Sequence, residues 1–198
     1  TLEAISFDYG SKHNGRELPM ARELCEKFKV RHQIISLPFI NELFSSSLLS
    51  SGDAVPDGSY MASNMKSTVV PFRNGIMLSI AAGYAESVDA SEVLLGSHSG
   101  DHHIYPDCRP EYYEAYNQVI KVGTKAGNIQ VKTPVIDLKK HEIVLKAKEL
   151  GAPVEKSWSC YAREDEACGV CDSCALRLRG FQVANLKDPI PYAKRPLY

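Results

Sequence analysis

Apolar residues along the chain follow two patterns, short apolar runs and longer stretches with helical spacing. The runs at 2–7, 32–37 and 92–97 predict strands, because runs of this length bounded by polar residues are typical of buried strands. Helical spacing follows the first run, where Pro19 fits only the first turn of a helix and predicts a start near Leu18. The same pattern predicts a helix capped by Asn74, a helix over 110–125, a strand over 129–135 and a helix between Asp137 and Gly151.

This alternation of strands and helices predicts an α/β protein with a Rossmann-like, doubly wound parallel sheet. Such sheets bind ligands beyond the carboxyl ends of their strands. Polar residues gather in three segments at those ends, 8–13, 96–111 and 133–137. The stretch 45–66 is rich in Ser, Gly, Asp and Pro and has little periodicity, so we expect a long mobile loop there.

Composition sets limits on the partners of the chain. The 198 residues are 44% hydrophobic and 24% charged, which is ordinary for one globular domain, and the formal net charge of −1 provides no basic field for nucleic acid. No apolar run approaches the ~20 residues that a membrane span requires, and we see no signal-peptide pattern. We therefore expect a cytoplasmic protein with no membrane contact and no direct nucleic-acid partner.

Four of the six cysteines lie close together near the end of the chain, in the pattern C-x7-C-x2-C-x2-C. A C-x2-C step lets two thiolates face one ion, and four thiolates complete a tetrahedral zinc shell that leaves no position for water. The pattern favours structural zinc, with iron–sulfur ligation and disulfides as alternatives. We expect Trp158 and Tyr161 to pack this segment. The metal ligands would be Cys160, Cys168, Cys171 and Cys174.

The histidine-rich segment 96–111 has only part of the ligand pattern of a dinuclear metal hydrolase, so a histidine metal centre is disfavoured. Carboxylates suit a hard cation, and a guanidinium grips phosphate or carboxylate at two points. In the functional interpretation Asp101 and Asp107 hold magnesium or a polar substrate, and Arg109 binds an anion. The alternative is a proline-punctuated turn in which Arg109 pairs with Glu111.

Two further segments are candidate nucleotide contacts. Arg73 stands at the start of a predicted helix, where free N–H groups bind anions, and Asn74 is expected to act as its N-cap. The segment 6–10 follows a strand, so its backbone could meet a flat base and Asp8 a ribose or a metal. The simpler alternatives are an ordinary helix cap and an ordinary strand-to-helix turn.

Five segments occur in a characteristic order: SFDYGSKH, VPFRNGIMLSIAAGYAE, YPDCRPEYYEAYN, KTPVIDLKKHEI and SCYAREDEACGVCDSCALRLRGF. Through these segments the chain resembles the QueC family, 7-cyano-7-deazaguanine synthase, over nearly its whole length. The resemblance implies an ATP-pyrophosphatase domain of the adenine nucleotide alpha hydrolase type, shared with NAD synthetase and GMP synthetase. It also implies a reaction in which ATP and ammonia convert 7-carboxy-7-deazaguanine to the nitrile through adenylylated acid and amide intermediates.

The resemblance further implies roles for individual residues, although it assigns no catalytic group. The four cysteines become the ligands of one structural Zn²⁺, and Asp101 becomes a candidate ligand of the Mg²⁺ that accompanies ATP. Substrate contacts would come from Tyr105, Asp107 and Arg109. ATP contacts would come from Ser6, Phe7, Asp8, Tyr9, Arg73 and Asn74. We also expect a homodimer.

One motif of the family does not occur in this sequence. The pyrophosphate-binding loop S-G-G-x-D-S is missing, and the SSG at 50–52 is not followed by Asp–Ser. We therefore expect a truncated ATP-pyrophosphatase domain over 1–155, a zinc knuckle over 156–185 and an irregular tail over 186–198, with no ATP turnover by this chain alone. Two alternatives remain open, a related enzyme that stops at the amide or amidates another carboxylate, and a non-enzymatic zinc knuckle that binds RNA.

Overall fold

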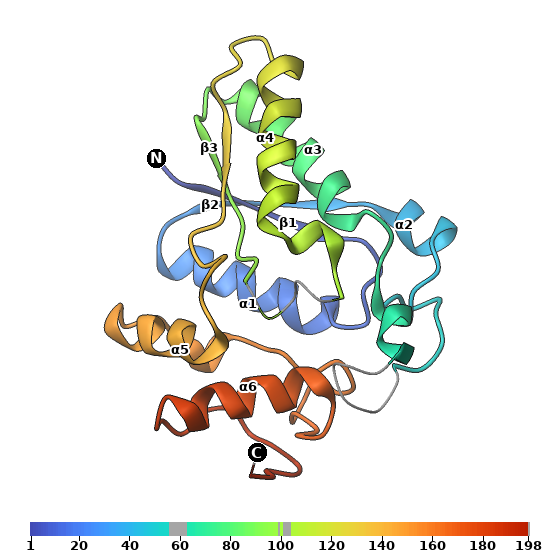
Figure 1. Ribbon diagram of the computed structural model, residues 1–198, viewed down its shortest axis with the longest axis vertical. Helices are drawn as coiled ribbons and strands as arrows, with labels where there is room; N and C mark the ends of the chain where they lie inside the picture. The colour runs from blue at the N-terminus through green and yellow to red at the C-terminus, as the bar shows by residue number, and fades with distance from the viewer. Residues whose placement is uncertain (56–62, 99, 101–103, 198) are drawn as a thin grey trace. The chain divides into compact units, whose positions relative to one another are not determined.

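Parallel strand pairs form the sheets of the computed structural model (Figure 1). The chain divides into two compact units: unit 1 comprises Thr1–Pro71 and Lys140–Tyr198, and unit 2 comprises Phe72–Lys139. The predicted boundaries of the domain, knuckle and tail stay a prediction. The structure describes residues 1–55, 63–98, 100 and 104–197.

Each described strand pairs with one other strand that lies some distance away in the sequence. In unit 1, β1 (Glu3–Asp8) pairs with β2 (Arg31–Ser36), and in unit 2, β3 (Glu92–Leu94) pairs with β4 (Gln130–Lys132). Parallel pairing is therefore confirmed. The single doubly wound sheet stays a prediction, because the described strands form two separate pairs.

Helices connect and flank these strands. The α-helices are α1 (Asn14–Lys27), α2 (Pro38–Leu43), α3 (Arg73–Ser87), α4 (Pro110–Gly123), α5 (Lys140–Glu149) and α6 (Asp172–Val183), and the 3₁₀ helices are η1 (Ser63–Thr68), η3 (Pro106–Cys108) and η4 (Val154–Lys156). In the part of the chain that the structure describes, no helix is both long and apolar enough to cross a bilayer.

Helix α1 begins earlier than the predicted start near Leu18. The N–H of Asn14 donates to the Ser11 carbonyl at 3.1 Å, and this turn starts the helix directly after β1. Pro19 consequently lies inside α1. The prediction was wrong because an internal proline removes only one hydrogen bond, a local cost that the rest of the helix and its packing can offset.

Residues 46–49 are buried, although a mobile loop was expected over 45–66. The Ser47 N–H donates to the Ser67 carbonyl at 2.8 Å, so this stretch of backbone is paired with a distant segment. The expectation of mobility was wrong for residues 46–49, because low periodicity does not reveal such long-range pairing. Residues 56–62 lie outside the described part of the chain.

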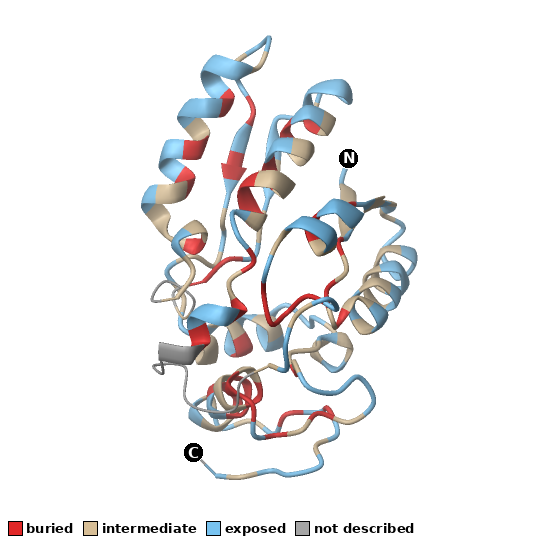
Figure 2. Cartoon of the chain, turned by 90° about the vertical axis from the view of Figure 1, so that its right-hand side faces the viewer, coloured by how far each residue is buried: buried red, intermediate tan, exposed pale blue. Residues whose placement is uncertain are grey.

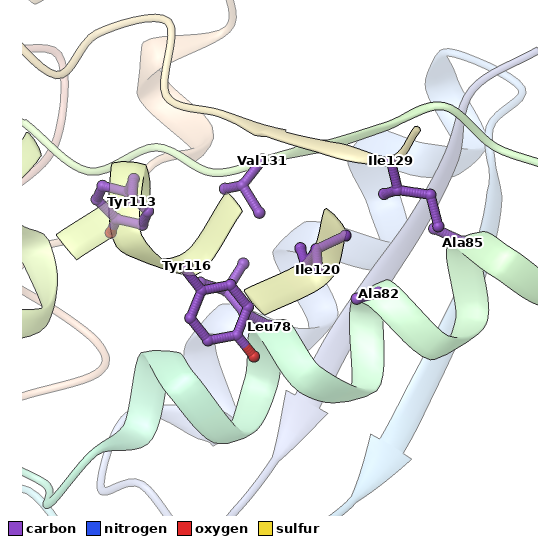
Figure 3. Packing of buried hydrophobic residues seen from close by; sticks show 8 residues of the cluster. All are labelled: Leu78, Ala82, Ala85, Tyr113, Tyr116, Ile120, Ile129 and Val131. Carbon is purple, nitrogen blue, oxygen red and sulfur yellow. The ribbon is translucent and has the colours of Figure 1, made fainter. Parts of the chain in front are cut away.

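Helices α3 and α4 pack beside the β3–β4 pair in unit 2 (Figures 1 and 3). Figure 3 shows Tyr116 and Ile120 of α4 between α3 and the strand segment that carries Ile129 and Val131. The Tyr116 hydroxyl donates to the Gly75 carbonyl at 3.0 Å, so the buried phenol is hydrogen-bonded. Unit 2 thus has a hydrophobic core of its own, formed by Leu78, Ala82, Ala85, Tyr113, Tyr116, Ile120, Ile129 and Val131.

A buried ion pair ties α6 to the C-terminal segment of unit 1. Arg177 and Asp188 are 5% and 2% exposed, and two guanidinium nitrogens donate to the carboxylate at 2.7 and 3.0 Å. The Tyr192 hydroxyl donates to the same carboxylate at 2.8 Å, and Arg177 also donates to the Ser157 hydroxyl. In this segment Asp188 and Ile190 are buried, whereas the chain next to the marked C-terminus is mostly exposed, pale blue in Figure 2. The network holds residues 186–197, which have no helix or strand of their own.

Replacing Asp188 by alanine is expected to lower the free energy of unfolding by about 3–5 kcal/mol, because the buried Arg177 charge loses its partner. Urea denaturation followed by circular dichroism measures the change. The control is Glu149→Ala, which breaks an ion pair with Lys146 whose side chains are 65% and 51% exposed. That loss is expected to stay below about 1 kcal/mol. Equal losses in the two variants would contradict the role given to the buried pair.

Candidate metal centre and candidate binding segments

Four cysteine sulfurs converge in unit 1. Cys160 and Cys168 lie in loops, Cys171 is the N-cap of α6, and Cys174 lies in its first turn. All four sulfurs lie within 4.8 Å of one another, and those of Cys168 and Cys174 are 3.9 Å apart. Zinc–sulfur bonds of about 2.3 Å in a tetrahedron require sulfur–sulfur distances of ~3.8 Å. The cluster therefore has the size of a four-thiolate metal site, as its spacing in the sequence predicted.

Backbone N–H groups and neighbouring thiols stabilise thiolate in this cluster. The N–H of Cys168 donates to the Cys160 sulfur at 3.3 Å, and the N–H of Cys171 donates to the Cys168 sulfur at 3.3 Å. Hydrogen bonds from Cys171 and Cys174 lower the pKa of Cys160 far below its ordinary value. The same contacts with Cys160 raise the pKa of Cys171 to about 11 and raise the pKa of Cys174. A cation bound by all four sulfurs would release the remaining protons, so its affinity depends on pH.

The C-terminal segment closes over the cysteine loop. Ala167 forms a parallel bridge with Tyr192, and the Ala193 N–H donates to the Ala167 carbonyl at 2.9 Å. Gly169 has a left-handed φ of 78°, and a Cβ at this position would lie 1.6 Å from the Lys194 carbonyl oxygen. Only glycine fits this turn. Four thiolates would fill a tetrahedral shell, which is typical of a structural metal rather than a catalytic one.

Replacing Cys171 by serine is expected to lower zinc affinity by at least about 100-fold, more than the loss of an outer-shell partner, because a neutral hydroxyl replaces a thiolate ligand. Competition with a chromogenic zinc chelator measures this affinity. Cys25→Ser on α1 is the matched control, since Cys25 lies outside the cluster. In the unmodified chain, zinc affinity is expected to fall as the pH is lowered below about 11, because protons then compete for the Cys171 and Cys174 thiolates, whose pKa values are raised. Full affinity in Cys171→Ser would rule out this ligand set.

The segment around the first cysteine, residues 158–164, packs on the start of α1. The Tyr161 ring stacks on His13 with ring centroids 5.1 Å apart, and the Arg16 guanidinium lies 4.7 Å from the centroid of the Trp158 ring. The sequence predicted only that these two aromatic residues pack the cysteine segment. Their contacts with His13 and Arg16 were missed, because the partners lie far apart in the chain and share no local motif. The cysteine cluster therefore supports the turn that follows β1.

The predicted ATP contacts of unit 1 lie at the end of β1. The Ser6 hydroxyl is hydrogen-bonded to Nε2 of His32 at 2.9 Å, and an α1 side-chain amide donates to the Asp8 carboxylate at 2.6 Å. Tyr9 is buried and Phe7 is half-buried. The structure brings these residues together in one strand and the turn behind it, whereas their binding of ATP stays a prediction.

In unit 2, two of the predicted contact residues meet at the start of α3. The Asn74 N–H donates to the Asp107 carboxylate at 3.1 Å, and its side-chain amide donates to the Asp107 carbonyl at 3.1 Å and to the Cys108 sulfur at 3.4 Å. Asp107 therefore satisfies an N-terminal N–H of α3, where the helix dipole favours a carboxylate. The prediction of Asn74 as N-cap was wrong, since Phe72 precedes the helix and Asn74 lies inside it. An anion at the same N–H would compete with Asp107.

A buried tyrosine supports this corner. The Tyr113 hydroxyl donates to the Asp107 carbonyl at 3.0 Å and is also hydrogen-bonded to the Ser97 hydroxyl. Burial raises the pKa of Tyr113, so the phenol keeps the proton that it donates. Neither residue was predicted from the sequence, because Ser97 follows β3 and Tyr113 lies on α4 with no motif linking them. Together they fix the backbone of the loop that carries Asp107.

The other predicted residues of unit 2 take separate positions. Arg73 is the first residue of α3 and donates to the Asn74 side-chain oxygen at 3.4 Å. Tyr105 precedes η3, and Arg109 is the N-cap of α4; both are half-buried. Asp101 lies outside the described residues. The roles of these residues toward substrate, ATP and magnesium stay predictions.

Replacing Asp107 by alanine is expected to lower the free energy of unfolding by about 1–2 kcal/mol, because the α3 N–H groups lose their acceptor. Urea denaturation measures the loss. The matched variant Asp107→Asn keeps a side-chain oxygen for the Asn74 N–H and is expected to retain most of the stability. If the alanine variant matches the parent chain, Asp107 does not act as the cap of α3.

The parallel strand pairs, the flanking helices and the four-cysteine cluster define an α/β protein with a group of thiols that could hold a metal ion. Residues 1–185 match the family described as Queuosine biosynthesis protein QueC. The chain belongs to this family, as the order of the five sequence segments predicted.

Named relatives support the same assignment. The chain is 60% identical over 177 residues to the 7-cyano-7-deazaguanine synthase of Desulfotalea psychrophila. The aligned region covers 89% of this chain and 80% of the relative. It is 46% identical over 196 residues to the enzyme of the same name from Koribacter versatilis, covering 98% of this chain and 83% of the relative. It is also 46% identical over 191 residues to 7-cyano-7-deazaguanine synthase 2 of Colwellia psychrerythraea, covering 96% of this chain and 86% of the relative.

Proposed function

We propose that this chain, together with a segment that supplies the S-G-G-x-D-S loop, acts as an ATP-dependent carbon–nitrogen ligase that converts 7-carboxy-7-deazaguanine and ammonia to 7-cyano-7-deazaguanine. The observation that carries the proposal is the 60% identity, over 89% of the chain, to a relative named for that product. The proposal places the chain in queuosine biosynthesis, in agreement with the description of its family.

The proposed reaction has three steps. The substrate carboxylate attacks the α-phosphorus of ATP, releasing pyrophosphate and forming an acyl adenylate. Ammonia attacks the acyl carbon, releases AMP and gives the amide. The amide oxygen attacks a second ATP, pyrophosphate leaves, and loss of AMP with two protons from nitrogen gives the nitrile. Each activation joins a poor leaving oxygen to AMP, so that AMP becomes the leaving group, and Mg²⁺ when bound would neutralise phosphate charge.

The residues of this chain would bind and orient the reactants. The turn after β1, with Asp8 and the buried Tyr9, would meet the adenosine part of ATP. The loop that carries Asp107 and Arg109 would contact the acid substrate, with Arg109 suited to a carboxylate or phosphate. Zinc bound by the four cysteines would act on structure alone, by holding residues 158–164 on the start of α1.

We also propose that the chain works in a reducing cytoplasm and without a nucleic-acid partner. All six cysteines are free of disulfides, and cysteine clusters with thiolate spacing persist where thiols stay reduced. The net charge of −1 gives no general attraction to a phosphate backbone.

Mass spectrometry of the products from acid, ATP and ammonia tests the proposal. The zinc-loaded chain alone is expected to give no product, because its sequence lacks S-G-G-x-D-S. The same chain preceded by a segment of a relative that supplies this loop is expected to give the nitrile and two AMP per nitrile.

The outcomes separate the competing functions. One AMP per product, with the amide accumulating, would indicate an enzyme that stops at the amide. Turnover by the chain alone would refute the requirement for the added loop. Binding of RNA by a chain that binds neither ATP nor product would favour a zinc-knuckle module instead.

A further inference from the structure

A small cavity lies in unit 1 beside the cysteine cluster. Its volume is about 140 Å³, and its walls come from the start of α1, from the residues around Cys160 and from α6. The lining side chains that matter here are His13, Glu17, Trp158, Ser159, Tyr161 and Ser173. None of these six is a candidate metal ligand, although Cys160 of the cysteine cluster also lines the cavity.

The aromatic walls of the cavity are held in place. His13 is 6% exposed and stacks on Tyr161 with an interplanar angle of 29°. Trp158 is covered by the Arg16 guanidinium and donates from its indole nitrogen to the Arg163 carbonyl at 3.1 Å. A site with fixed walls loses little conformational entropy when a ligand binds.

The size of the cavity limits its ligand to about one ring. A cavity of ~150 Å³ holds benzene, so 140 Å³ admits a six-membered ring but not a whole nucleotide. Aromatic side chains on its walls suit a flat, unsaturated ring.

The polar groups of the cavity select against phosphate. Glu17 is exposed, so its carboxylate lies at the opening, and hydroxyls come from Ser159 and Ser173. No lysine or arginine is among the described residues that line the cavity. A carboxylate only accepts hydrogen bonds and offers about four acceptor sites, so it can bind a ligand besides the contacts it already makes.

We infer that this cavity takes the pyrimidine ring of the 7-deazaguanine substrate, with Glu17 accepting hydrogen bonds from its ring N–H and its 2-amino group. The inference rests on the proposed function, which supplies the ligand. The fused five-membered ring, which carries the reacting carbon, stays outside the cavity and accessible to ATP and ammonia.

This arrangement makes Glu17 a specificity-determining residue. Two adjacent N–H donors on one edge match the two oxygens of a carboxylate. A 2-desamino ring offers only one of these donors, and the Watson–Crick edge of adenine places an acceptor at the ring nitrogen, which the carboxylate repels. A polar site of this kind rejects analogues that leave its acceptor unpaired.

The fluorescence of Trp158 tests the inference directly, because it is the single tryptophan of the chain and lines the cavity. The zinc-loaded 198-residue chain is titrated with 7-cyano-7-deazaguanine and, separately, with its 2-desamino analogue. We expect a saturable fluorescence change with the first compound and binding about 10-fold or more weaker with the second.

Substitutions on α1 test whether Glu17 causes the preference for the 2-amino compound. Glu17→Gln is expected to remove the preference for the 2-amino compound, whereas Glu26→Gln, which makes the same charge change on an exposed position of the same helix, is expected to leave it unchanged. Circular dichroism and zinc content check that both variants are folded and loaded.

Other results overturn the inference in distinguishable ways. If calorimetry detects binding of the nitrile but Trp158 does not respond, or Glu17→Gln keeps the preference, the ring binds elsewhere and the proposed function still stands. A Trp158 response to ATP equal to that of the nitrile also overturns the site. If calorimetry detects no binding of the nitrile at all, both the site and the proposed function fail.

Discussion

Four sulfurs within 4.8 Å of one another are the constraint on which unit 1 depends, because thiolates gathered this closely repel one another unless a cation or shared protons offset their charge. Meeting that constraint draws together a loop, a glycine turn and the first turn of α6. It also fixes the neighbouring residues 158–164, whose aromatic side chains reach His13 and Arg16 at the start of α1. Through these contacts the cluster stabilises the turn that follows β1 and the walls of the neighbouring cavity, although neither contains all of the cysteines.

Buried charge plays a related part elsewhere in the chain. In unit 1 the Arg177–Asp188 pair holds an irregular segment that has no ladder of its own, and the same segment closes over the cysteine loop. In unit 2 the Asp107 carboxylate joins a loop to the start of α3, with Tyr113 holding the loop backbone. In each unit a carboxylate holds a stretch of irregular backbone whose conformation local propensity does not determine.

The errors of the sequence analysis share a physical origin. A start near Leu18, an N-cap at Asn74 and a mobile loop over 45–66 were all inferred from local preference. In the structure, the turn after β1, the distant Asp107 and the backbone of Ser67 decide these features instead. Most local propensities amount to about 1 kcal/mol per residue or less, so a single tertiary hydrogen bond or cap can override them. A proline inside a helix costs about 3 kcal/mol, so several tertiary contacts together must offset Pro19.

By itself, the sequence determined the family, the parallel pairing of strands and the four cysteines that form the candidate metal site. It could do so because short spacings such as C-x2-C fix geometry within one turn of chain. Tertiary structure alone decided that Asp107 caps α3, that Tyr161 stacks on His13 and that Glu17 opens onto a ring-sized cavity. These contacts join segments remote in sequence, and nothing in either segment specifies the partner until the chain has folded.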